Sequence, residues 1–164
     1  MRKLPVLLVS VIGLQSFASP VMASSRVVLA TGSFSVEGDP ATFEFFQQGQ
    51  QCLLQFEEVI TYTGTLEGTS DTVGPVQIRF FATCEEVFAT EGVGIRSNFS
   101  DIEHFVGTGG IAEGKEATFR TVGRTDAAGN FEGTIALHGD LNGRLRTVAS
   151  GANGTYEGMV VVEG

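Results

Sequence analysis

Glu58 and Tyr62 are the two residues of this sequence whose types and spacing are best suited to act together chemically. Side chains alternate between the two faces of a β-strand, so residues four apart point the same way. The apolar residues that share this predicted face are Cys52, Leu54, Phe56, Ile60 and Leu66. Apolar surroundings disfavour the charged form of a carboxyl group, which can then serve as a general acid or base.

Aromatic side chains are expected to form the walls of this site. Phe56 shares the face of Glu58, and Phe80 is expected on the neighbouring strand, opposite Phe56. We therefore predict that Glu58, Tyr62, Phe56 and Phe80 bind a ligand. The alternative is a bend in the strand at Glu57 and Glu58 that brings both carboxylates to solvent.

A second group, Asp101, Glu103 and His104, could suggest a metal site or an acid–base pair. Strand alternation places the two carboxylates on one face and His104 on the other, so the three do not converge. His138 is expected on a charged, solvated face. We expect no metal and no cofactor, and the sequence lacks the motifs typical of serine hydrolases, zinc proteases, nucleotide-binding loops and calcium loops.

The elements that must position these residues are strands. Glycines punctuate short runs rich in Val, Ile, Thr and Phe, which is typical of a strand meander, and no long helix is expected. The strands are predicted at 27–37, 42–47, 51–66, 76–88, 94–106, 116–124, 131–141 and 156–162. Eight strands with short turns favour an all-β fold with a single closed antiparallel barrel, which leaves no exposed sheet edge. The alternative is a β-sandwich.

Turn chemistry is clearest between the strands that Arg120 and Phe131 belong to. Asp126 and Gly129 fit a type I turn closed by a glycine in the left-handed conformation. Alternation then places Phe119, Phe131, Ile135 and Leu137 on one face, and Arg120, Arg124, Glu132, Thr134 and His138 on the other. Arg124 is expected opposite Glu132.

Cys52 and Cys84 are the only cysteines, and an even count in an exported chain predicts a disulfide, with two buried free thiols as the alternative. If the connection between the two strands turns at Gly68, antiparallel register places Cys52 opposite Cys84. The same register places Phe56 opposite Phe80.

The N-terminus predicts export. Arg2 and Lys3 precede an apolar stretch, 4–17, and Val21 and Ala23 fit a signal peptidase site, so residues 1–23 are predicted to be a signal peptide and 24–164 the β-barrel domain. A membrane anchor is the alternative, but the apolar run is shorter than the roughly 18 to 20 residues that span a bilayer. We expect a secreted or periplasmic protein without a membrane span.

Charge excludes one class of partner. The whole chain has a net charge of −9, and residues 24–164 carry eight basic and nineteen acidic side chains, which leaves −11. A charge of this sign repels phosphate backbones, so nucleic acid is not an expected partner.

Two segments resemble the barrel shared by allene oxide cyclases, dirigent proteins and bacterial relatives of uncharacterised function. They are 62–69 (YTGTLEGT) and the glycine-rich 105–119 (FVGTGGIAEGKEATF), in which Gly107, Gly109, Gly110 and Gly114 match the phrase that joins two barrel strands in that superfamily. The resemblance implies an eight-stranded, calycin-like barrel with a small apolar interior that can assemble as a trimer.

The resemblance also points to the first strand. Enzymes of the superfamily place a carboxylate and an amide there, followed by a Ser-Pro loop, and Glu37 and Pro40 echo that arrangement with a different spacing and without an Asn. Glu37 is therefore a further candidate ligand-binding residue.

Three functions remain open on the sequence. The first is an exported barrel, without strong catalytic activity, that binds a small apolar ligand or a protein partner. The second is an isomerase or cyclase of the allene oxide cyclase type. The third is a secreted structural protein that associates with itself.

Overall fold

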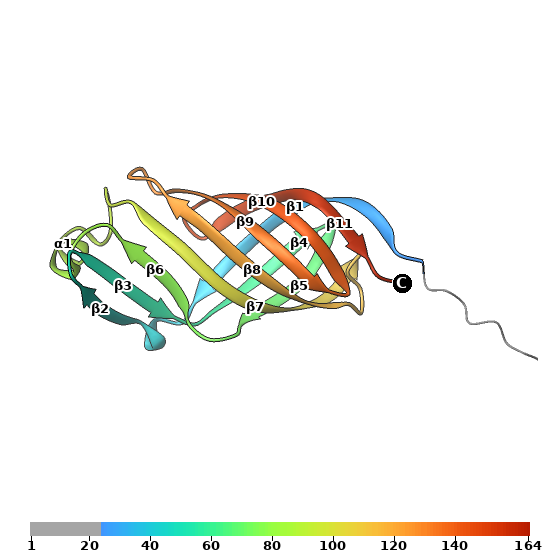
Figure 1. Ribbon diagram of the computed structural model, residues 1–164, viewed down its shortest axis with the longest axis horizontal. Helices are drawn as coiled ribbons and strands as arrows, with labels where there is room; N and C mark the ends of the chain where they lie inside the picture. Colours follow the sequence, from blue (N-terminus) through green and yellow to red (C-terminus); the bar gives the residue numbers. More distant parts are fainter. Residues whose placement is uncertain (1–23) are drawn as a thin grey trace, which may run out of the picture.

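The computed structural model describes residues 24–164, and the predicted signal peptide lies outside them. Eight strands form a closed antiparallel barrel, in the order β7, β5, β4, β1, β11, β10, β9 and β8, and pairing of β7 with β8 closes it (Figure 1). Their bounds are β1 (Arg26–Gly38), β4 (Glu58–Gly64), β5 (Leu66–Thr72), β7 (Ser97–Gly110), β8 (Glu116–Thr125), β9 (Asn130–Gly139), β10 (Leu141–Ser150) and β11 (Asn153–Val162). The predicted closed barrel is confirmed, and the alternative sandwich is wrong.

Three further strands extend one end of the barrel, at the left of Figure 1. These are β2 (Glu44–Gln48), β3 (Gln51–Phe56) and β6 (Val76–Phe80), and the short helix α1 (Cys84–Thr90) lies beside them. A 3-10 turn, η1 (Pro40–Thr42), separates β1 from β2, and Glu57 alone separates β3 from β4. Because β7 pairs with both β6 and β5, this extension is continuous with the barrel wall.

The predicted strands differ from the observed ones in four main places. The expected strand 51–66 breaks at Glu57, the expected strand 76–88 ends at Phe80, and β5 and β10 were not predicted. After Phe80 the chain forms α1 instead, because Thr83 and Glu86 make a capping box that satisfies the free amides at its start. β5 lacks a strong strand signal because the barrel interior takes small residues there: a Cβ at Gly68 would collide with the Phe105 ring.

The predicted disulfide between Cys52 and Cys84 is confirmed. The register argued for it is wrong, because Cys52 lies opposite Phe80, and Phe56 lies opposite Val76. Gly68 lies inside β5 rather than in the turn, and Cys84 is the first residue of α1. The disulfide therefore joins β3 to the helix rather than linking two paired strands.

The hairpin of β8 and β9 is as expected. Asp126 accepts hydrogen bonds from the amides of Ala128 and Asn130, and Gly129 has a φ of 84°. Arg124 lies opposite Glu132 and makes a surface ion pair of 3.7 Å with it.

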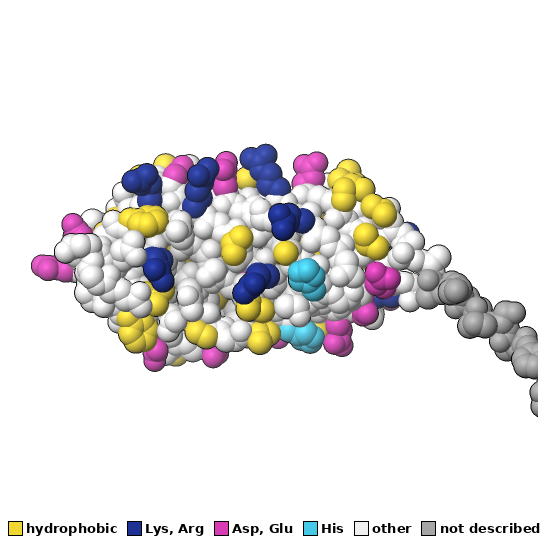
Figure 2. Space-filling view, viewed as in Figure 1, with side chains coloured by type: hydrophobic (Ala, Val, Ile, Leu, Met, Phe, Trp, Pro, Cys, Tyr) yellow, Lys and Arg dark blue, Asp and Glu magenta, His cyan; other side chains and the backbone are white. Residues whose placement is uncertain are grey.

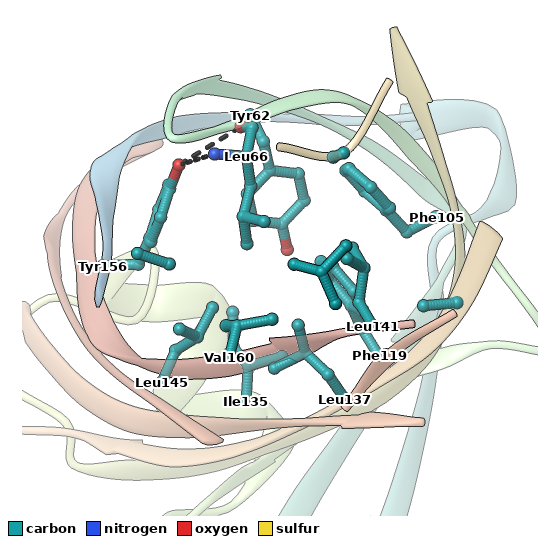
Figure 3. Close-up of a cluster of buried hydrophobic side chains, with 14 of the residues drawn as sticks. Tyr62, Leu66, Phe105, Phe119, Ile135, Leu137, Leu141, Leu145, Tyr156 and Val160 are labelled. Carbon is teal, nitrogen blue, oxygen red and sulfur yellow. Dashed lines mark hydrogen bonds between the residues drawn. The ribbon is translucent and has the colours of Figure 1, made fainter. Parts of the chain in front are cut away.

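Apolar side chains fill the end of the barrel at which the C-terminus lies (Figure 1). Figure 3 shows this plug, formed by Tyr62, Leu66, Phe105, Phe119, Ile135, Leu137, Leu141, Leu145, Tyr156 and Val160. Phe105 and Phe119 stack with ring centroids 4.5 Å apart. The Tyr156 hydroxyl accepts a hydrogen bond from the Leu66 amide and donates one to the Thr63 carbonyl, so this buried hydroxyl is satisfied as both acceptor and donor.

Within residues 24–164, no helix has the length and apolar character needed to cross a membrane.

Candidate functional site

The other half of the barrel interior is hollow. A cavity of about 330 Å³ opens toward the extension, where the lining residues Phe43, Gly151 and Ala152 are exposed. Aromatic rings line much of it. They are Phe34 and two ring pairs, Phe43 with Phe56 at a centroid distance of 5.0 Å and Phe99 with Phe131 at 5.5 Å. The polar side chains that line it are Glu58, Tyr62, Asp101, Glu103, Thr121, Thr125 and Thr147.

Glu103 is the centre of a buried hydrogen-bond network. Its Oε2 accepts hydrogen bonds from the Tyr62 hydroxyl, at 3.0 Å, and from the Ser70 hydroxyl, and its Oε1 accepts one from the Thr121 hydroxyl at 2.9 Å. The four side chains come from β7, β4, β5 and β8, all with inward-facing positions. These three hydroxyl donors satisfy both oxygens of the Glu103 carboxyl group, which explains how this side chain can be fully buried.

Glu58 and Asp101 are buried without such support. Glu58 is 4% exposed and Asp101 is 5% exposed. The Thr121 amide donates to Asp101 Oδ1 at 3.1 Å, whereas no N–H or hydroxyl donates to Glu58 Oε1 or Asp101 Oδ2. The Glu58 and Asp101 side chains are hydrogen-bonding neighbours, as are those of Asp101 and Glu103, and such a carboxyl pair bonds only while one member carries a proton. These two acids therefore rely on carboxyl protons, which a bound donor can replace.

Burial changes the acidity of both groups. It raises the pKa of Glu58 to about 7; the neighbouring Asp101 side chain acts against this shift and the charge of Glu103 adds to it. It raises the pKa of Asp101 to about 10, with further increases from the charges of Glu103 and Glu58. Both carboxyls can therefore hold a proton near neutral pH, and Glu58 can exchange it there.

Three of the five predicted ligand-binding residues line the cavity: Glu58, Tyr62 and Phe56. The strand is interrupted at Glu57, as the alternative reading expected, but only the Glu57 side chain reaches solvent. The interruption therefore does not release Glu58 from the interior.

The other two predicted residues, Glu37 and Phe80, lie away from the cavity. Glu37 is exposed on the outer face of β1, opposite Val59, because the inward positions of that strand are those of Phe34, Val36 and Gly38. Phe80 packs against the Cys52–Cys84 cluster in the extension, since the true register pairs it with Cys52. Neither residue lines the cavity.

Asp101, Glu103, Ser70 and Thr121 belong to the site but were not predicted as site residues. Alternation along the strand could have identified two of them. Asp101 and Glu103 share a strand face with Phe105, and an apolar ring is expected to point into the barrel, so the two carboxyls are expected there as well. The predicted separation from His104 is confirmed: His104 is exposed and lies 3.3 Å from Glu116 on the outer surface.

Basic side chains lie outside the barrel. Of the eight Lys and Arg residues in 24–164, seven are exposed and Lys115 is half-buried, and Figure 2 shows several of them on the outer surface. No Lys, Arg or His is among the cavity-lining residues. Among the residues that the structure describes, no group of three His, Cys, Asp or Glu side chains is arranged to hold a metal ion.

These features define a closed eight-stranded β-barrel that is plugged at one end and hollow at the other. No protein-family model and no curated protein sequence matches the chain. Among solved structures, it is similar to a protein of unknown function from the DUF3224 family of Shewanella oneidensis MR-1. The two share 18% identity and a TM-score of 0.53, over 85% of this chain and 99% of that one, which is a likeness of fold.

Proposed function

We propose that this protein binds a small, largely apolar ligand inside the barrel. The observation that carries the proposal is the open cavity of about 330 Å³ with five phenylalanines in its lining. Ligand pockets in proteins span roughly 300 to 1,000 Å³ and combine apolar walls with a few polar groups. Protein interiors are otherwise close-packed, so a hollow half beside a tightly filled half supports a binding role over a purely structural one.

A neutral fluorescent probe, N-phenyl-1-naphthylamine, tests this proposal. Ala149 lines the cavity, whereas the adjacent Val148 is exposed on the outer face of β10. We expect saturable enhancement of probe fluorescence at one site per chain. Ala149→Trp should weaken binding by about tenfold or more by filling the cavity, and Val148→Trp should leave it unchanged.

Two results would contradict the proposal. One is the absence of saturable binding by the unmodified protein. The other is equal loss of binding in both tryptophan variants while both retain their far-ultraviolet circular dichroism, because the probe would then bind outside the barrel.

Isomerase or cyclase activity on a reactive apolar intermediate is the second candidate function. It is favoured by Glu58, whose pKa of about 7 suits a proton donor or acceptor beside the aromatic ring of Phe56. The resemblance to allene oxide cyclases and dirigent proteins agrees with it. Turnover of a bound compound that persists unchanged in Glu58→Gln would rule out this role for Glu58.

We also propose that the protein is secreted or periplasmic. The predicted signal peptide supports export, and the Cys52–Cys84 disulfide is typical of an oxidising compartment. Assembly as a homo-oligomer, a trimer by family resemblance, stays a prediction.

A further inference from the structure

We propose that the preferred ligand is an organic ammonium ion, with an apolar body against the phenylalanines and its charged nitrogen at Glu58 and Asp101. This inference rests on the proposed function, since it names the chemical class of the molecule in the same cavity. It follows from the arrangement of charge, hydrogen-bonding capacity and aromatic rings along the barrel interior.

The cavity carries acidic groups without a basic partner. Three carboxyls line it, and its lining includes no Lys, Arg or His. Buried carboxyls in proteins are normally paired with a cation or hydrogen-bonded. Glu103 accepts hydrogen bonds from three hydroxyls, whereas one buried oxygen of Glu58 and one of Asp101 have no N–H or hydroxyl donor and only the protons of the carboxyls themselves. A cation that enters the cavity replaces those protons, because it brings both a positive charge and N–H donors to the ionised carboxyls.

The order of residues along two strands sets the orientation of the ligand. On β7, Phe99 comes first, then Asp101, then Glu103, and Phe105 belongs to the plug. On the chain that passes from β3 into β4, Phe56 precedes Glu58. Since all of these side chains point inward, the aromatic rings lie on the open side of the carboxyls. An apolar body is therefore held nearer the mouth and a charged group deeper inside.

An ammonium ion fits these carboxyl groups better than a neutral alcohol does. A primary ammonium presents three N–H donors, and unpaired carboxyl oxygens are acceptors for them. A neutral alcohol offers one donor and no charge.

Binding of a cation is coupled to proton release. The titratable groups that face the cavity are Glu58 and Tyr62 on β4 and Asp101 and Glu103 on β7; the lining contributed by the other strands carries none. Burial raises the pKa values of Glu58 and Asp101, so both hold protons in the empty cavity near neutral pH. An ammonium ion favours their charged forms and displaces protons to the buffer. Its affinity therefore increases as pH rises through the pKa of Glu58, whereas the affinity of a neutral ligand does not.

Isothermal titration calorimetry with 2-phenylethylammonium and 2-phenylethanol, which match in shape, tests the inference. At about pH 8 the ammonium ion is expected to bind at least about tenfold more tightly than the alcohol. Its affinity should fall by about tenfold or more from about pH 8 to about pH 6, with buffer-dependent heats that report proton release. Glu58→Gln should remove most of the preference, and Glu57→Gln, which changes the exposed neighbour, should retain it.

Each other outcome is decisive. Equal binding of the two compounds, or a preference that is independent of pH, overturns the ammonium assignment and leaves the proposed apolar-ligand function intact if N-phenyl-1-naphthylamine still binds. Failure of both compounds and of that probe overturns both proposals. If Glu58→Gln does not fold, Asp101→Asn and the pH dependence of the unmodified protein provide the same test.

Discussion

Two adjacent glutamates in this chain have opposite environments. Glu57 is exposed at the break between β3 and β4, and Glu58, the first residue of β4, is 4% exposed inside the barrel. Strand alternation alone accounts for the difference, because consecutive side chains point to opposite faces. The same rule makes Glu57 a matched control for every substitution at Glu58.

Stability should decrease as pH rises through the range in which Glu58 loses its proton. An acid whose pKa is higher in the folded protein than in the unfolded chain makes the folded state bind more protons, so the free energy of unfolding falls with rising pH. For Glu58 the fall runs from about 4.5 to about 7, and Asp101 extends it toward about 10. Its size for Glu58 is on the order of 3 kcal/mol.

Urea unfolding of Glu58→Gln at about pH 5 and about pH 8 measures this effect. The variant should be more stable than the unmodified protein at the higher pH and similar to it at the lower one, and Glu57→Gln should change neither. An equal effect of Glu58→Gln at both pH values would mean that the substitution acts through packing rather than charge.

For residues within a regular strand, alternation in the sequence predicts correctly which side chains point into the barrel. It places Phe56, Glu58 and Tyr62 on one inward face, and it places His104 on the opposite face from Asp101 and Glu103. Glu37, which the family resemblance suggested, lies outside the barrel, because it alternates with Phe34 and Val36, whose side chains line the cavity. The network around Glu103 could not be found from one strand, since its donors come from three others.

At the scale of elements, two short irregular segments, η1 and Glu57, separate the barrel strands from the strands of the extension. η1 and Glu57 interrupt neighbouring strands at the same level of the barrel, where Asp39 donates its amide hydrogen to the Glu57 carbonyl. These interruptions mark the boundary between barrel and extension. The sequence predicts which two cysteines form the disulfide but not the register of the strands around it. A register error of four residues leaves every side chain on the same face of the sheet and changes only the residue that lies opposite it.

The Cys52–Cys84 disulfide should stabilise the extension more than the barrel. It closes a segment with a sequence separation of 32 and anchors α1, which lies against β2 and β3. Replacing both cysteines with alanine should lower the free energy of unfolding by about 2 to 4 kcal/mol. Hydrogen exchange should accelerate in α1 and β2 and remain slow in β10 and β11. Uniform acceleration across all strands would show that the disulfide supports the whole fold equally.

At the scale of the whole molecule, one barrel combines a plugged end and a hollow end. The plug contains the large buried side chains Phe105, Phe119 and Leu141, and the hollow end contains unpaired acids and partly exposed phenylalanines. The eight-strand barrel could be predicted from glycine punctuation and short apolar runs. Which half is filled could not, because that depends on how eight strands stagger around a common axis.

Native mass spectrometry of the protein purified from its own host tests the molecule-scale proposals together. We expect a denatured mass that begins at Ser24 and lacks two hydrogens because of the disulfide, and a native mass increased by a bound small molecule. The native spectrum also reports the number of chains. A denatured mass that includes residues 1–23 would contradict processing, and a native mass equal to the sum of its chains would count against a retained ligand.

The division of the barrel into two halves has a consequence for how the protein can change. Most of the plug is built from residues that do not line the cavity, and the ones that do both, such as Tyr62 and Ile135, lie at its deep end rather than at the mouth. Substitutions at the mouth, such as Phe43, Thr125 or Ala149, therefore alter the shape and polarity of the cavity at little cost in folding. A chain built this way tolerates rapid divergence at one end. It is also a practical scaffold for selecting new specificities, with a library confined to the hollow half and the plug left unchanged.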